Sequence, residues 1–403
     1  MLKADFDLAI VGGGIVGLAT GLAISERSPE LSIVVIEKEA DVARHQTGHN
    51  SGVVHSGIYY RPGTLRARLC VEGVKLLRQF CEEQELPYDR CGKVIVATHE
   101  DELPRLETLF ERGTRNGVPG IEMIGPERLR EIEPQAAGVK AIWSPNTSIV
   151  DYGAIARRYA EILRERGAHF QFGSEVTGIR EAEGLLRIAT ASGEIRSRFL
   201  INCAGLYSDE VARMAGHRPD VQVVPFRGEY YRLRPEKREL VRGMIYPVPD
   251  PAFPFLGVHL TSTVKGEVEA GPNAVFAFAR EGYGWGRIAP RELAQSLRYP
   301  GVWQLARKHW RVAAFEYYRS LSKRAFVQSL QRLVPSLREE DVVKDGAGVR
   351  AQALNRDGSL VDEFVIISSR RALHVLNAPS PAATASLAIG RHLAAEMLEL
   401  AAA

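Results

Sequence analysis

The chain has few cysteines and almost no net charge. Its 403 residues include four cysteines. None of them forms a C-x-x-C pair, so neither a disulfide framework nor a zinc site is expected. The formal charge of +3 at pH 7 is too small to indicate a nucleic-acid partner. We therefore predict a protein of a reducing interior that binds no metal and no nucleic acid.

The sequence also lacks a convincing membrane segment or leader. Residues 7–24 are mostly apolar, but a glycine cluster interrupts them and charges at Asp7 and Glu26 flank them, which disfavours a membrane span. The first residues offer neither the basic start nor the small-residue cleavage site of a signal peptide. We expect a mature cytoplasmic protein.

The N-terminal region has the order of elements that is typical of a nucleotide-binding βαβ unit. An apolar run over residues 6–11 is followed at once by a G-x-G-x-x-G fingerprint at Gly12, Gly14 and Gly17. A helical pattern comes next, and a second apolar run over residues 32–36 ends on an acid. Such continuous apolar runs are typical of strands buried on both faces of a parallel sheet.

Each part of this unit has a mechanical role. Gly12 permits the tight turn, Gly14 lets the backbone approach a pyrophosphate, and Gly17 lets the helix pack closely on the strand. Glu37 stands where an acid accepts hydrogen bonds from a ribose and disfavours a 2′-phosphate. The pattern indicates FAD or NAD, and the alternative is an ordinary βα turn without a nucleotide.

Residues 45–60 have no clear helical or strand period. They include three histidines, three glycines and several hydroxyl side chains. A loop of this composition can bring its backbone close to a flat polar ligand, although a glycine-rich surface turn is the simpler alternative.

Several motifs together make the chain similar to a known family. Besides the fingerprint with Glu37, they are residues 46–60 (QTGHNSGVVHSGIYY), 69–73 (LCVEG), 202–205 (NCAG), 226–231 (FRGEYY), 246–250 (YPVPD), 348–352 (GVRAQ) and 377–384 (NAPSPAAT). Over nearly its full length the chain resembles the D-amino-acid-oxidase-like FAD enzymes, and within them the L-2-hydroxyglutarate dehydrogenases, also called oxidases.

The resemblance implies FAD as cofactor and a set of residues that bind it. In that family the end of the strand at 199–202 returns to the cofactor, and the backbone of Val176 contacts adenine. The implied cofactor residues are Gly12, Gly14, Gly17, Glu37, Lys38, Thr47, Asn50, Ser51, Gly52, Val53, Val176, Ala204, Gly205, Gly348, Pro379, Ser380, Ala382 and Thr384.

The substrate end is expected near residues 342–352. Arg350 and Gln352 are two residues apart on a predicted strand and so share one face. A guanidinium can bind a carboxylate through two parallel hydrogen bonds, whereas an exposed arginine in a surface ion pair is the simpler alternative. The hydroxyl of Tyr59 or Tyr60 is a further candidate for orienting the substrate.

Oxidation of a 2-hydroxy acid needs a base for the hydroxyl proton, and histidine is the usual one. The candidates are His45, His49, His55 and His259. We favour His55, which lies in the glycine-rich loop among small residues. His259, on an alternating strand, is the second choice, with a structural role as its alternative.

The predicted fold class is α/β, with a Rossmann-type FAD-binding domain and an α+β substrate domain, because 403 residues exceed the usual size of one core. The FAD-binding domain is expected to be discontinuous and to have a parallel sheet. It comprises residues 1–80, 150–212 and 338–403. The substrate domain comprises 81–149 and 213–337, with an antiparallel sheet of strands at 222–233, 243–248, 255–262 and 274–279.

Residues 287–332 combine ten lysines and arginines with aromatic residues that include Trp303, Trp310, Phe315, Tyr317, Tyr318 and Phe326. Such a segment is typical of amphipathic helices lying on an anionic membrane, and attachment to the inner face of the cell membrane would let electrons pass to a quinone. The alternative is a solvated helical face whose aromatic residues belong to the core.

We weigh three functions. The first is FAD-dependent oxidation of L-2-hydroxyglutarate, a dicarboxylate, to 2-oxoglutarate by hydride transfer to flavin, with a quinone or oxygen as acceptor. The second is another oxidoreductase of the superfamily, such as an amino-acid oxidase or a glycerol-3-phosphate dehydrogenase. The third is a flavoprotein without catalytic activity.

Overall fold

The computed structural model describes residues 4–250 and 256–402. Its first sheet contains β1 (Phe6–Val11), β2 (Ile33–Ile36), β9 (His169–Gln171), β10 (Val176–Ala182), β11 (Leu185–Thr190), β12 (Gly193–Asn202), β19 (Val365–Ser368) and β20 (Ala372–Asn377). The strand order is β10-β11-β12-β1-β2-β9, with β20 on β12 and β19 on β20. β1 runs parallel to β2 and β12, and β9 and β20 extend this parallel centre. The expected parallel sheet therefore forms the centre, while β10, β11 and β19 add antiparallel edges.

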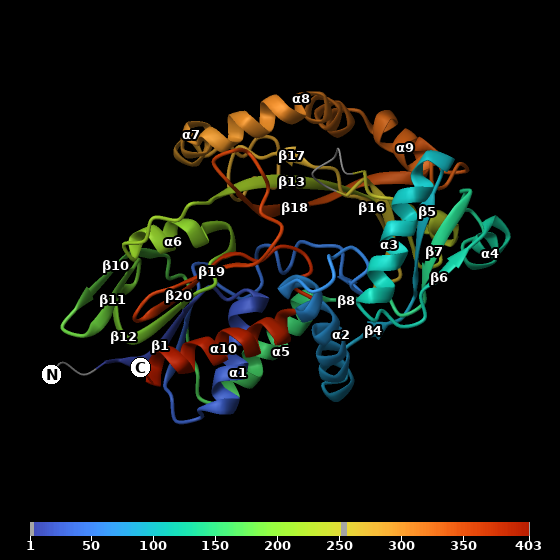
Figure 1. Ribbon diagram of the computed structural model, residues 1–403. Helices are drawn as coiled ribbons and strands as arrows, with labels where there is room; N and C mark the ends of the chain where they lie inside the picture. Colours follow the sequence, from blue (N-terminus) through green and yellow to red (C-terminus); the bar gives the residue numbers. More distant parts are fainter. Residues whose placement is uncertain (1–3, 251–255, 403) are drawn as a thin grey trace.

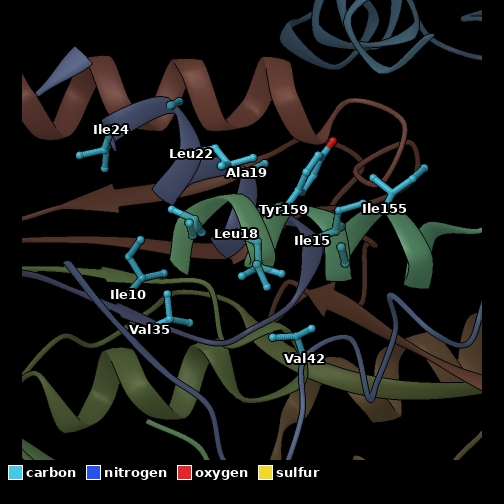
Figure 2. Close-up of a cluster of buried hydrophobic side chains, with 14 of the residues drawn as sticks. Ile10, Ile15, Leu18, Ala19, Leu22, Ile24, Val35, Val42, Ile155 and Tyr159 are labelled. Atoms are coloured by element: carbon cyan, nitrogen blue, oxygen red, sulfur yellow. The ribbon is translucent and has the colours of Figure 1, made fainter. Parts of the chain in front are cut away.

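Helices cover one face of this sheet, as Figure 1 shows. They are α1 (Ile15–Arg27), α2 (Leu65–Glu83), α5 (Tyr152–Glu165) and α10 (Ser386–Ala402). α1 is apolar on most of its circumference because it is enclosed by α5, α10 and the sheet. Figure 2 shows Leu18 and Ala19 of α1 in the same buried cluster as Ile10 of β1 and Tyr159 of α5.

The glycine fingerprint forms the predicted turn between β1 and α1. Gly12 has φ +107°, a left-handed conformation that disfavours other residues. A Cβ atom on Gly12 would lie 2.5 Å from the carbonyl oxygen of Cys203, and one on Gly17 would lie 2.3 Å from the carbonyl oxygen of Gly12. Both glycines are therefore required by close approaches of the backbone.

The second sheet has nine strands in the order β17-β13-β16-β15-β14-β5-β7-β6, with β18 on β13. They are β5 (Lys93–Ala97), β6 (Glu122–Ile124), β7 (Lys140–Ser144), β13 (Gln222–Leu233), β14 (Met244–Pro247), β15 (His259–Ser262), β16 (Val268–Gly271), β17 (Val275–Phe276) and β18 (Val342–Leu354). The sheet is mixed and not purely antiparallel as expected, because β14 pairs in parallel with β5.

Three details of the second sheet differ from the sequence prediction. β18 pairs with β13 along its length, so residues 342–354 extend this sheet although they were expected in the FAD-binding domain. β16 was not predicted, and only residues 275–276 of the expected strand 274–279 are extended. The strand expected at 255–262 begins at His259, and residue 255 lies outside the described residues.

The remaining helices and strands lie around the second sheet, except for residues 208–214, which pack mainly against β10 and β20 of the first sheet. They are α3 (Leu103–Arg115), α4 (Pro126–Ile132), α6 (Ser208–Met214), α7 (Pro290–Arg298), α8 (Pro300–Leu321), α9 (Lys323–Gln331), and a small sheet of β3 (Val53–Val54), β4 (Tyr88–Asp89) and β8 (Ser148–Val150). In Figure 1, α7, α8 and α9 lie over the face of the second sheet that is turned away from α1 and α10. This confirms the helices predicted for residues 287–332.

Candidate active site

A cavity of about 830 Å³ lies between the two large sheets. Its walls include the carboxyl ends of β1, β2 and β20, together with residues of β13, β15 and β18. Crevices at the carboxyl ends of parallel strands are the usual ligand sites of α/β folds, and this volume is in the upper part of the range for small-molecule sites.

Most of the predicted cofactor residues line this cavity. They are Gly12, Gly14, Glu37, Lys38, Thr47, Asn50, Ser51, Val53, Val176, Ala204, Gly205, Gly348, Pro379, Ser380, Ala382 and Thr384. Gly17 and Gly52 lie behind the wall, where a Cβ on Gly52 would approach the carbonyl oxygen of Val150 to 2.5 Å. The structure thus brings together segments that are up to 372 positions apart, from Gly12 to Thr384.

The nucleotide end has the groups that a dinucleotide needs. Gly14 is the N-cap residue of α1 and makes no side-chain hydrogen bond to the helix. The positive N-terminus of α1 favours a pyrophosphate at this position. Glu37 is 9% exposed. Its carboxylate accepts hydrogen bonds from the backbone N–H of Gly13 at 2.7 Å and of Glu39 at 2.9 Å, which fixes it beside the turn.

The other end of the cavity joins the loop after β20 to the histidine-rich loop. The hydroxyl of Thr384 accepts a hydrogen bond from the backbone N–H of His55 at 3.1 Å and lies 2.8 Å from the hydroxyl of Tyr152. These contacts hold the backbone of both loops against the cavity, as a flat cofactor ring requires. The long cavity, the open glycine turn and the anchored loops fit FAD.

Two of the four candidate bases lie in the buried part of the cavity. Burial, with a smaller contribution from the nearby ammonium group of Lys93, lowers the pKa of both His55 and His259 to about 3. Both imidazoles are therefore neutral at pH 7. His45 and His49 line the outer part, where His45 is engaged with Glu39 and Tyr283 and His49 with the carbonyl of His45.

The tautomer of His259 follows from its hydrogen bond. Its Nδ1 lies 2.8 Å from the carbonyl oxygen of Gly257, which can only accept, so Nδ1 carries the proton and Nε2 has a free lone pair. By contrast, Nδ1 of His55 is buried and has no hydrogen-bond partner among the described residues.

The predicted substrate residues Tyr60, Arg350 and Gln352 also line the cavity. Arg350 and Gln352 project from β18, opposite Phe226 and Val224 of β13. Burial raises the pKa of Tyr60 above its ordinary value, so its phenol stays protonated and can donate a hydrogen bond. The amide of Gln352 donates to the carbonyl oxygens of Ala353 and Val361, which fixes its orientation.

Sequence reasoning missed Lys93 and gave no role to Tyr246, although it named Tyr59 as a possible substrate-orienting residue. The ammonium of Lys93 lies 4.8 Å from the ring centre of Tyr59 and 5.1 Å from that of Tyr246, and both rings line the cavity. The single sequence signal for Lys93 is its position at the start of the apolar run 93–97. A lysine at such a position is common at the end of an ordinary strand.

A group of three potential metal ligands lies at the edge of the cavity. Glu39, His45 and Glu281 offer atoms within 4.8 Å of one another. The ammonium of Lys38 contacts both carboxylates, at 2.6 Å for Glu281, so an internal cation already compensates one of their two negative charges.

No helix within the described part of the chain is both long enough and apolar enough to cross a membrane.

Comparisons with known proteins agree with this site. The family model for FAD dependent oxidoreductases (DAO) matches residues 7–396. The L-2-hydroxyglutarate dehydrogenase of Indibacter alkaliphilus is 50% identical over 96% of this chain and 97% of that protein. The mitochondrial L-2-hydroxyglutarate dehydrogenase of Homo sapiens is 46% identical over 98% of this chain and 89% of that protein.

Solved structures with lower identity share the fold. The FAD-bound L-alpha-glycerophosphate oxidase of Mycoplasma pneumoniae superposes with a TM-score of 0.78 at 22% identity, covering 99% of this chain and 95% of that one. The glycine oxidase of Bacillus cereus gives a TM-score of 0.70 at 16% identity, covering 98% and 95%. The α/β fold with an FAD-binding Rossmann unit is thus confirmed, and the chain belongs to the FAD-dependent oxidoreductases and, within them, to the L-2-hydroxyglutarate dehydrogenase family.

Proposed function

We propose that this enzyme oxidises L-2-hydroxyglutarate to 2-oxoglutarate. The observation that carries the proposal is one cavity in which the FAD cradle adjoins two neutral histidines and Arg350. The identity of 41–50% to L-2-hydroxyglutarate dehydrogenases supports the same substrate. FAD, if held along Gly12, Gly14 and the loop at Thr384, would supply a two-electron acceptor for the hydride of C2.

His259 is the better placed of the two histidines to accept the hydroxyl proton. Because Nδ1 donates to Gly257, the lone pair of Nε2 is available as a general base. His55, whose Nδ1 has no partner among the described residues, is available to hydrogen-bond the substrate and orient its hydroxyl. This assignment makes His259 the base and His55 a binding residue.

Arg350 binds the carboxylate next to the reacting carbon, with Tyr60 and Gln352 completing the pocket. A guanidinium can hold a carboxylate in one plane through two hydrogen bonds, which limits rotation about C2. The protonated phenol of Tyr60 adds a donor. Holding the substrate in this way converts a bimolecular encounter into an oriented reaction.

Anaerobic reduction of the flavin tests the function. L-2-hydroxyglutarate should bleach the visible flavin spectrum, whereas the D-enantiomer should leave it unchanged. An amino-acid oxidase would instead be reduced by an amino acid, and a glycerol-3-phosphate dehydrogenase by that phosphate ester. Flavin that stays oxidised with L-2-hydroxyglutarate would contradict the proposal.

The proposed electron acceptor is a quinone, reached by docking of α7 and α8 on an anionic membrane, with oxygen as the alternative. α8 exposes Trp303 (60%), Trp310 (61%), Tyr318 (57%) and Leu321 (74%). Its exposed cations are Arg307, Lys308 and Arg311. Aromatic residues beside cations on a surface helix favour the interface of an anionic bilayer. Phe326 of α9, by contrast, belongs to the core.

Co-sedimentation with vesicles tests this surface. The protein should bind vesicles that contain phosphatidylglycerol and not those of phosphatidylcholine alone, and added salt should weaken binding. The double variant Trp303→Ser/Trp310→Ser should lose it, whereas Val139→Ser, at an exposed apolar site elsewhere, should keep it. Equal binding by both variants would exclude this surface and leave oxygen as the acceptor.

A further inference from the structure

Lys93 is a buried cation beside the reacting part of the cavity. It is the first residue of β5, in the second sheet, and is 1% exposed. Its ammonium lies over the rings of Tyr59 and Tyr246. These two rings form part of the cavity wall together with His55 and His259.

No negative group compensates Lys93 within residues 4–250 and 256–402. Neither a hydrogen bond nor an ion pair of its ammonium is found there. The titratable groups that face it come from each neighbouring element: His55 and Tyr59 from the loop, Cys70 from α2, Tyr246 from β14 and His259 from β15. Arg66 and Arg350 add positive charge to the same region, and none of these groups is a carboxylate.

An unpaired ammonium in such a position is unfavourable for stability. Burial lowers the pKa of Lys93 to about 7, because the charged form loses hydration without gaining a negatively charged partner. A methionine of similar length would fill the same space without this penalty. The lysine therefore suits the site only if a ligand brings negative charge to it.

We propose that Lys93 is a specificity-determining residue that selects a dicarboxylate by supplying the positive charge for the second carboxylate. The proposal rests on the proposed function. Arg350 binds the carboxylate beside C2. The ammonium of Lys93, which lies behind the cavity wall formed by Tyr59 and Tyr246, attracts the distal carboxylate. A monocarboxylate of the same length lacks this attraction.

A proton must accompany the substrate at alkaline pH. Since the pKa of Lys93 is about 7 in the empty site, most of the lysine is neutral at pH 8. A nearby carboxylate favours the charged form, so binding of the dianion draws close to one proton from solvent. Neutral His55 and His259, with pKa values of about 3, are much further from protonation.

Calorimetry on the FAD-loaded protein tests this coupling with glutarate, a dicarboxylate that cannot be oxidised at C2. Titrations at pH 8 in two buffers of different ionisation enthalpy report the protons taken up. The wild type should take up nearly one proton per glutarate. Lys93→Met should bind glutarate about tenfold more weakly, equivalent to about 1.4 kcal/mol, and take up none. Butyrate should bind both proteins equally.

A matched control and a stability measurement separate this role from a structural one. Lys140→Met, on neighbouring β7 with its partly exposed ion pair to Glu107, should bind glutarate like the wild type. The melting temperature of Lys93→Met should equal or exceed that of the wild type, and Lys93→Gln serves as second variant if the methionine variant does not fold.

The outcomes that overturn the inference are distinct from those that overturn the function. Equal glutarate affinity in wild type and Lys93→Met, or proton uptake that persists in the variant, would refute the proposed role of Lys93. The proposed function of the enzyme would be unaffected by this result. A wild type that binds neither glutarate nor 2-oxoglutarate would refute the dicarboxylate substrate, and the inference with it.

Discussion

Burial lowers the pKa of both His55 and His259 from 6.5 to about 3. In the unfolded chain each histidine titrates near its ordinary pKa of 6.5. Between this pH and about 3, the unfolded state therefore binds more protons than the folded state. The free energy of unfolding must therefore fall as the pH decreases through this window. One histidine contributes a slope of about 1.4 kcal/mol per pH unit.

His259→Gln should flatten the pH dependence of stability. Between pH 6 and pH 4 the slope of the unfolding free energy should decrease by about 1.4 kcal/mol per pH unit, measured by denaturant unfolding. His99→Gln, at an exposed position, should leave the slope unchanged. A slope in His259→Gln equal to that of the wild type would mean that His259 is protonated alike in both states.

The same substitution should separate chemistry from binding. Removing a general base typically lowers the rate about 10²- to 10⁴-fold, so His259→Gln should lower kcat for L-2-hydroxyglutarate by this factor while the flavin spectrum remains. His55→Gln should mainly raise KM. Steady-state kinetics distinguish the two, and the reverse pattern would make His55 the base.

At the level of elements, the β1–α1 turn depends on close backbone contacts. A Cβ on Gly17 would lie 2.3 Å from the carbonyl oxygen of Gly12, whereas one on Gly21, in the same helix, would meet only side-chain methyl groups at 3.2–3.3 Å. Gly17→Ala should therefore lower the unfolding free energy by about 2–3 kcal/mol and weaken FAD retention.

Gly21→Ala is the matched control for this helix. Its side-chain contacts can adjust, and the higher helix propensity of alanine contributes about 1 kcal/mol in the opposite direction. Thermal unfolding followed by flavin fluorescence compares the two variants. Equal losses of stability would mean that helix packing in general, and not the contact with Gly12, explains the effect.

The sequence predicts elements well where local pattern and tertiary structure agree. The apolar run 6–11, the glycine turn and the run 32–36 correspond to β1, the turn and β2. The pattern fails where long-range pairing decides. β18 follows the helical segment by chain order, but its partner is β13, more than 100 positions earlier, and no local signal reports that choice.

The residues of the site also divide into those that local sequence pattern predicts and those that depend on long-range contacts. Most of the cofactor residues that the glycine fingerprint and the family resemblance imply do line the cavity. Lys93 could not be predicted, since its significance depends on Tyr59 and Tyr246, which approach it from other segments. The tautomer of His259 likewise depends on a carbonyl group that only the fold brings to its Nδ1.

At the level of the whole molecule, a buried ion pair joins α6, which packs on the first sheet, to the segment that follows β17 of the second sheet. Nη1 of Arg280, which follows β17, lies 2.7 Å from Oδ1 of Asp209 in α6, and both side chains are almost fully buried. The carboxylate of Asp209 also accepts from the backbone N–H of Val223 at 3.3 Å. Removal of Asp209 would leave the buried guanidinium of Arg280 with Glu210, at 3.3 Å, as its remaining close carboxylate partner.

Asp209→Ala should lower the unfolding free energy by about 3–5 kcal/mol, measured by denaturant unfolding. The double variant Asp209→Leu/Arg280→Met should recover most of this loss, because it removes both of the deeply buried charges. Asp5→Ala, which removes a partly exposed pair with Arg196, should change stability little. A double variant as unstable as Asp209→Ala would show that packing, and not charge, dominates here.

The cofactor cavity draws its walls from both ends of the chain, from Gly12 through Gly348 to Thr384. During translation, the ribosome therefore releases the β1 turn hundreds of residues before β18 and the loop after β20 exist to enclose a flavin. A nascent chain can form the Gly12 turn but cannot retain the cofactor, so FAD loading follows synthesis. Since a ligand that binds only the native state stabilises it, full-length chains should be degraded faster, and so be less abundant, in a cell that is short of flavin.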